Sequence, residues 1–218
     1  MHIKSGSGPN ISQVTEAGLV SKIGINSAGV GVFLNAVQAR GVNYRALPVH
    51  IALRVALESE SSEAAAGRLR SWGVATACHI LIADKLDAKS LEFSHLDCHV
   101  LPMKQGKVAH TNHFLAQHEV GVKDRLAWPD SVPRMHRVSS LLDKLDAGMG
   151  ATEAFEAIEK ILEDEDGFPV SINRQVTPTS SSATLFSIVA DLNNATAHVR
   201  LGRPTEVEGS WKLAPALL

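Results

Sequence analysis

The fold class is decided first by the stretch Lys22-Ile23-Gly24-Ile25-Asn26-Ser27-Ala28-Gly29-Val30-Gly31-Val32-Phe33-Leu34. Apolar residues alternate on both sides of a four-residue segment that tolerates positive φ angles. This pattern predicts a β-hairpin, whose second strand Asn35 and Ala36 close. The three glycines Gly24, Gly29 and Gly31 lie close together, which indicates strong twist or close packing by a neighbouring layer.

Two helices and further strands are predicted after this hairpin. The first helix begins near Pro48 and is apolar almost all round to Leu57, which is typical of a helix buried on more than one side. A second helix is capped near Ser61 and runs to about Trp72. Short core strands are then expected at residues 78–83 and 90–94.

The second half of the chain is predicted to contain two helices followed by strands. Helical spacing of apolar residues predicts helices over 135–145 and 152–162, the latter capped by Thr152. The acidic run 163–166 favours a solvated turn over a metal site. Alternation predicts a final hairpin of strands at 183–189 and 196–201. Strands and helices alternate in blocks without regular βαβ units, which predicts an α+β layered fold.

Composition excludes several classes of protein. The 218 residues carry 21 basic and 23 acidic side chains, so no bulk charge attracts the chain to nucleic acid or to a membrane surface. No apolar run reaches the roughly 20 residues of a membrane helix, and Met1–Pro9 lacks the apolar centre of a secretory signal. Two cysteines make no disulfide framework. We therefore expect an intracellular, cytoplasmic protein with neither nucleic acid nor membrane as partner.

The densest group of polar side chains is His110-Thr111-Asn112-His113, followed by His118. Steps of three and five residues do not bring all three imidazoles to one point on a helix, so no metal site is expected here. Asn112 could aim its amide at a developing negative oxygen, or it could satisfy backbone groups of a turn. Spacing alone leaves these two roles of Asn112 equally open.

Other candidate nucleophiles are weaker. Cys78 lies in an apolar run and is expected to be a buried, inert thiol. Cys98 lies beside Asp97, whose negative charge raises the pKa of a thiol. The serines Ser180-Ser181-Ser182 precede a strand, and such a run is more often a solvated loop than a site.

In its ordered motifs the chain resembles the isopenicillin N acyltransferase (acyl-CoA:6-aminopenicillanic acid acyltransferase) family. The resemblance extends from about residue 15 to residue 205. Its main segments are Thr15-Glu16-Ala17-Gly18, Lys22 to Val30, Asn35-Ala36, His50-Ile51-Ala52-Leu53-Arg54, Leu91-Glu92-Phe93-Ser94, His110-Thr111-Asn112-His113, Gln117-His118, Ala183-Thr184-Leu185-Phe186 and Val199-Arg200-Leu201-Gly202-Arg203-Pro204-Thr205.

The resemblance implies an N-terminal-nucleophile hydrolase with a four-layer αββα sandwich. In this family a precursor cuts itself before a Cys, whose thiol and free α-amino group then serve as nucleophile and general base. The substrate is an amide or an acyl-CoA thioester, and no cofactor is implied. Asn112 matches the family's oxyanion asparagine, and we expect His110, Thr111 and His113 to support it, together with Ser180 and Ser181.

The chain also departs from the family pattern. No Cys precedes Cys78, so the family's nucleophile is not in this chain. We therefore expect residues 1–14 to form a disordered or truncated arm, and 15–218 a partial domain that lacks its first strands and would need that segment as a partner. The alternative is a catalytically inactive relative that acts as a binding module. A Ser-Arg-Gly motif of fungal members reads Ser180-Ser181-Ser182 here, and residues 215–218 carry no recognisable peroxisomal tripeptide.

Overall fold

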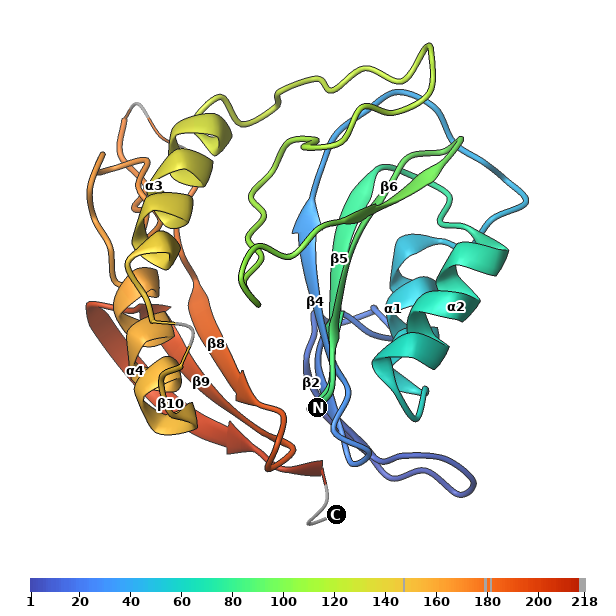
Figure 1. Ribbon diagram of the computed structural model, residues 1–218, viewed down its shortest axis with the longest axis horizontal. Helices are drawn as coiled ribbons and strands as arrows, with labels where there is room; N and C mark the ends of the chain where they lie inside the picture. The colour runs from blue at the N-terminus through green and yellow to red at the C-terminus, as the bar shows by residue number, and fades with distance from the viewer. Residues whose placement is uncertain (147, 179, 181, 216–218) are drawn as a thin grey trace.

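The computed structural model describes residues 1–146, 148–178, 180 and 182–215. Two antiparallel sheets face each other, and a pair of helices lies on the outer side of each (Figure 1). The layers therefore follow the order helix, sheet, sheet, helix. This arrangement confirms the α+β class and the four-layer αββα sandwich.

The first sheet has seven strands, and each strand pairs with its neighbour in the chain. Because every pair is antiparallel, short turns connect most of them. The expected hairpin is confirmed, with β3 and β4 paired through Gly24 and Val32. The strands are β1 (His2–Ile3), β2 (Ile11–Val14), β3 (Ile23–Asn26), β4 (Gly31–Ala36), β5 (Cys78–Ala83), β6 (Ala88–Phe93) and β7 (Cys98–Leu101).

Helices α1 (Val49–Leu57) and α2 (Ser62–Trp72) cover the outer face of this sheet (Figure 1). Both were expected, and the Ser61 side chain caps α2 by accepting a hydrogen bond from the amide of Ala64 at 3.1 Å. Leu53 and Leu69 from the helices pack with Ile80 of β5 in the main core, all with no exposed surface.

The second sheet contains β8 (Phe186–Asp191), β9 (Thr196–Arg203) and β10 (Glu206–Leu213), in the order β10-β9-β8. Helices α3 (Ser131–Asp143) and α4 (Ala151–Leu162) lie on its outer side, with α4 against β8 (Figure 1). The β8–β9 hairpin was expected. The third strand, β10, was not, because the charges at Glu206, Glu208 and Lys212 interrupt its apolar pattern.

A small apolar cluster joins the two sheets. Ile25 of β3 contacts a group of buried residues on β9 and β10: Ala197, Val199 and Leu213. Leu192, in the turn between β8 and β9, approaches the first hairpin so closely that a Cβ atom at Gly31 would lie 2.9 Å from its side chain. The glycines of the hairpin thus allow close packing by the neighbouring layer, which is one of the two interpretations that the sequence suggested.

Three expectations were wrong in their details. Residues 1–14 are not a disordered arm, because β2 is buried and forms four paired positions with β3. Thr152 does not cap α4; Gly150 precedes that helix, and Thr152 lies within its first turn. The acidic run 163–166 is not simply solvated, since each of its side chains pairs with a basic partner: Lys160, Arg137, Arg200 or Arg203.

Within the part of the chain that the structure describes, every helix is too short or too polar to span a bilayer.

Candidate active site

A fully buried carboxylate organises the segment around Asn112. Glu92, on β6, has no exposed surface. Its Oε1 accepts hydrogen bonds from His110 Nε2 and from the amide of Leu115, both at 2.6 Å, and its Oε2 accepts one from the amide of Ala116 at 2.8 Å. The Glu92 side chain therefore fixes the chain on both sides of Asn112 to the first sheet.

These hydrogen bonds keep Glu92 ionised. Burial by itself raises the pKa of this carboxyl group, but the hydrogen bonds from His110 and from the amides of Leu115 and Ala116 outweigh that effect. The net result is a pKa below the ordinary glutamate value of 4.5. A charged acceptor strengthens each of the bonds that hold the turn.

A second histidine, His79, packs against the ring of His110. The His79 ring stacks on the His110 ring, with centroids 3.8 Å apart and planes 5° from parallel. Its two nitrogens face Asn35 Oδ1 at 3.0 Å and Ser90 Oγ at 2.8 Å. Burial, and secondarily the adjacent His110, lowers the pKa of His79 from 6.5 to about 2, so this ring is neutral.

The first residue of α3 fixes the other side of the turn. Ser131 is buried, and its Oγ accepts a hydrogen bond from the amide of Asn112 at 2.6 Å and lies 2.7 Å from His113 Nδ1. Its carbonyl accepts the hydroxyl of Thr111 at 3.0 Å. Thr111 and His113 therefore contact the same serine and hold the turn against the helix.

The Asn112 side chain is oriented by two further groups. Its Oδ1 accepts a hydrogen bond from Arg134 at 2.9 Å, and its Nδ2 donates to the carbonyl of Ala36 at 3.0 Å. The second hydrogen of Nδ2 has no acceptor among the residues that the structure describes. The amide is thus held in one orientation, with one N–H available to an incoming oxygen.

Arg134 belongs to a largely buried charged cluster. Asp130 accepts hydrogen bonds from Arg134 Nε at 2.7 Å and from Arg174, so two guanidinium groups share one carboxylate. Burial and the neighbouring Arg134 charge lower the pKa of Arg174, while Asp130 raises it. Arg134, Arg174 and Asp130 together carry one net positive charge, and Arg134 brings it into contact with Asn112.

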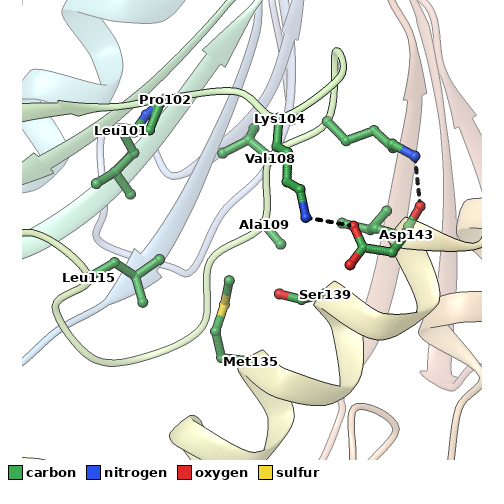
Figure 2. A pocket seen from close by; sticks show the side chains of 11 residues that line it. Leu101, Pro102, Lys104, Val108, Ala109, Leu115, Met135, Ser139 and Asp143 are labelled. Carbon is green, nitrogen blue, oxygen red and sulfur yellow. Dashed lines mark hydrogen bonds and ion pairs between the residues drawn. The ribbon is translucent and has the colours of Figure 1, made fainter. Parts of the chain in front are cut away.

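A cavity of about 370 Å³ lies on the other side of this segment, between the chain from Leu101 to Leu115 and helix α3 (Figure 2). Its walls are mainly apolar, and Met135 projects into it from α3 beside Ser139 (Figure 2). Lys104 lies at its rim, 3.4 Å from Asp143. Its lining includes Ala109 and Leu115, which lie on either side of the candidate oxyanion turn in the chain.

Neither Cys78 nor Cys98 has the environment of a nucleophilic thiol. Cys78 is buried, and burial raises the pKa of its thiol. Burial also raises the pKa of Cys98, to about 11, with Asp97 adding to the shift and Arg70 opposing it. Both groups are protonated at neutral pH, as the sequence indicated.

The imidazoles of His110, His113 and His118 do not converge on one point. His110 and His118 approach opposite oxygens of Glu92, whereas His113 faces Ser131. Ser180 is buried in a separate turn, where it pairs with Thr177, and its hydroxyl lies 3.5 Å from the carbonyl of Ser182. No described hydrogen bond joins it to Asn112, and Ser181 lies outside the described residues.

Sequence reasoning did not identify Glu92, Ser131 or Arg134 as parts of this site. Glu92 carried one usable signal, because a single acid inside an otherwise apolar strand segment demands buried hydrogen-bond partners. Ser131 and Arg134 are separated from the turn by about twenty residues, and no local pattern connects them with it.

Comparisons with solved structures agree on the fold. Penicillin V acylase from Agrobacterium tumefaciens superposes with a TM-score of 0.61 at 12% identity, over 92% of this chain and 71% of that one. A variant of conjugated bile acid hydrolase from Clostridium perfringens gives a TM-score of 0.62 at 13% identity, over 94% and 77%. These neighbours confirm the N-terminal-nucleophile hydrolase fold.

Sequence comparison identifies the family. The 40 kDa form of acyl-coenzyme A:6-aminopenicillanic-acid-acyltransferase from Emericella nidulans is 41% identical over 206 residues. That match covers 93% of this chain but 56% of the relative, so the chain spans about half of the relative's length. The family described as acyl-coenzyme A:6-aminopenicillanic acid acyl-transferase matches residues 12–206. The chain therefore belongs to the acyl-coenzyme A:6-aminopenicillanic acid acyltransferase family.

Proposed function

We propose that this chain supplies the oxyanion-stabilising part of a cysteine-dependent acyltransferase or amidohydrolase. The observation that carries the proposal is the orientation of Asn112, whose oxygen is held by Arg134 and whose amide keeps one free N–H among the described groups. A preorganised donor of this kind stabilises the negative oxygen that develops when an acyl carbonyl is attacked.

The reaction would proceed through an acyl-enzyme. A thiolate attacks the carbonyl carbon of an amide or acyl-CoA thioester, and the carbonyl electrons move onto oxygen, where the Asn112 N–H donates to them. The amine or CoA thiol leaves with a proton from the general base as the carbonyl reforms. An amine or water then attacks the acyl-enzyme and releases the thiol. The net positive charge of Arg134, Asp130 and Arg174 adds to the stabilisation of the anion.

The nucleophile in this proposal comes from a polypeptide segment outside the 218 residues. Cys78 and Cys98 have raised thiol pKa values and lie within the first sheet, so neither fits the role. The family resemblance implies an N-terminal Cys upstream of the matched region, and the chain spans about half of its curated relative.

The apolar cavity between residues 101–115 and helix α3 is the proposed site for the acyl group. Its walls include Leu101, Leu115 and Met135, which suit a hydrocarbon or aryl chain more than a polar one (Figure 2). A small-molecule amide or an acyl-CoA with an apolar acyl group is thus the proposed substrate class.

The test begins with this chain alone and a reactive acyl-CoA, followed by intact mass spectrometry. No acyl adduct is expected on the wild type. A longer protein that begins with a Cys-led segment should form one adduct and turn over. In that protein, Asn112→Ala should lower kcat by about 10²–10³ while the fold stays intact.

Asn193→Ala is the matched control, because Asn193 lies in an exposed turn between β8 and β9. Its kcat should equal that of the wild type. An unchanged kcat in Asn112→Ala would remove the oxyanion role. Binding of acyl-CoA by the longer protein without turnover would instead support a binding module.

A further inference from the structure

A cluster of metal-ligating side chains lies next to Glu92 and was not anticipated from the sequence. Asp97, His99 and His118 place one ligand atom each within 4.8 Å of one another. Asp97 lies in the turn just before β7, and His99 is the second residue of that strand. His118 reaches them from the segment that carries Asn112.

Asp97 lies between the two imidazoles. Its Oδ1 is 2.5 Å from His118 Nδ1, and its Oδ2 is 3.1 Å from His99 Nε2. The Ser94 hydroxyl and the amide of Glu119 also donate to this carboxylate. These contacts hold the carboxylate in one position between the two imidazoles.

His118 provides the second observation. Its side chain is only 2% exposed, yet its Nε2 has no hydrogen-bond partner, although Glu92 Oε2 lies 3.5 Å away. A proton on Nε2 would be directed at the Glu92 carboxylate, and Nδ1 would then coordinate an ion in place of its present hydrogen bond with Asp97. This is the usual arrangement of a metal-bound histidine, whose second nitrogen donates to a carboxylate.

We propose that Asp97, His99 and His118 bind a divalent first-row transition metal, with Zn²⁺ as the reference ion. Two imidazoles and one carboxylate suit Zn²⁺ or Co²⁺ and not Mg²⁺ or Ca²⁺, which prefer oxygen ligands. His99 is 40% exposed, so an ion can enter from solvent and keep water in its remaining positions.

The position of the site also links it to the Asn112 turn. Glu92 would receive His118 Nε2–H on one oxygen while it accepts His110 Nε2–H on the other. A bound ion would therefore fix one more side chain on the carboxylate that holds the turn. The proposal stands independently of the acyl-transfer reaction, because it rests on these contacts alone.

The test is metal binding by the full 218-residue chain. After chelation and dialysis, titration with Co²⁺ should give visible absorption bands that saturate at one ion per chain, and Zn²⁺ should displace them. Zn²⁺ should also raise the melting temperature. His99→Gln should weaken binding at least about tenfold, since even supporting groups contribute this much. His99 is partly exposed, so the variant is expected to fold.

His95→Gln is the matched control, because His95 lies in the same turn but is not part of the cluster. It should bind Co²⁺ as the wild type does. Equal binding by wild type and His99→Gln would overturn the proposal, as would an absence of saturable binding. A selective response to Mg²⁺ or Ca²⁺ would overturn the assignment to a transition metal.

Discussion

Among single residues, Glu92 has the largest influence on the Asn112 segment, because it accepts three hydrogen bonds without any exposure to water. Glu92→Gln replaces one acceptor oxygen by an NH₂ group that faces another donor. We expect a loss of about 2–4 kcal/mol in the free energy of unfolding, measured by urea denaturation.

The control is Glu119→Gln, which removes an exposed charge on the same segment and should change stability by less than about 0.5 kcal/mol. If the two variants unfolded at the same urea concentration, Glu92 would not have the structural role assigned to it.

The buried His79 leads to a separate prediction about how the free energy of unfolding depends on pH. Its folded pKa of about 2 lies far below the ordinary 6.5. Below pH 6.5 the unfolded chain therefore binds a proton that the folded chain does not, and stability falls as pH falls. Between pH 6.5 and 5 this one group should reduce the unfolding free energy by up to about 1.4 kcal/mol per pH unit.

The measurement is the free energy of unfolding at several pH values in wild type and His79→Gln. The variant should be less stable at pH 7 but should have a shallower slope. His136→Gln, at an exposed position on α3, is the control and should follow the wild-type slope. Parallel slopes in all three proteins would contradict the buried neutral state of His79.

At the level of elements, the pairing of β2 with β3 depends on Gly24. A Cβ atom there would lie 2.3 Å from the carbonyl oxygen of Ser12 and 2.6 Å from the Cα of Gln13, both on the neighbouring strand. Gly24→Ala should therefore destabilise the protein by about 3 kcal/mol or more, because backbone must move to admit one methyl group.

Gly67→Ala provides the contrast. Gly67 lies in α2, and a methyl group added there would have no neighbouring atom within 4 Å, so the substitution should stabilise the protein by about 0.5–1 kcal/mol. Thermal melts of the two variants should move in opposite directions. If both variants shifted the melting temperature in the same direction, the close contact of Gly24 with β2 would not determine the effect of Gly24→Ala.

Helix α3 offers a test of the acyl cavity. Ser139 lines that cavity, whereas Ser140 is exposed on the same helix. Ser139→Trp should fill the space and weaken binding of a medium-chain acyl-CoA by about tenfold or more, as judged by calorimetry. Ser140→Trp should bind like the wild type. Equal affinities in the two variants would place the acyl group elsewhere.

In the whole molecule, the two halves of the sandwich differ in their cores. The first sheet and its helices enclose a large cluster of fully buried residues, whereas four buried residues join the second sheet to the first. We expect amides of β9 to exchange with deuterium faster than those of β5, because fewer buried contacts oppose opening of the second sheet. Hydrogen exchange followed by mass spectrometry measures this, and equal protection of both strands would contradict it.

Local sequence patterns were sufficient where neighbours in the chain decide the structure. The alternation around Asn26 to Gly29 predicted the β3–β4 hairpin, and Ser61 predicted the start of α2. Local patterns failed where an element depends on pairing with strands from other parts of the chain. Strand β2 is short, and its polar residues Ser12 and Gln13 are buried only because β1 and β3 lie beside it.

The candidate site shows the same division. The sequence by itself determined the family, since this follows from the identity and order of residues. The role of Asn112 as an oxyanion donor stays a prediction from the family resemblance. Only the tertiary structure decided which groups orient that amide and where His118 meets Asp97. Glu92, Ser131 and Arg134 come from elements about twenty residues away. Sheet and helix packing brings them together, and no periodicity in the chain records such long-range contacts.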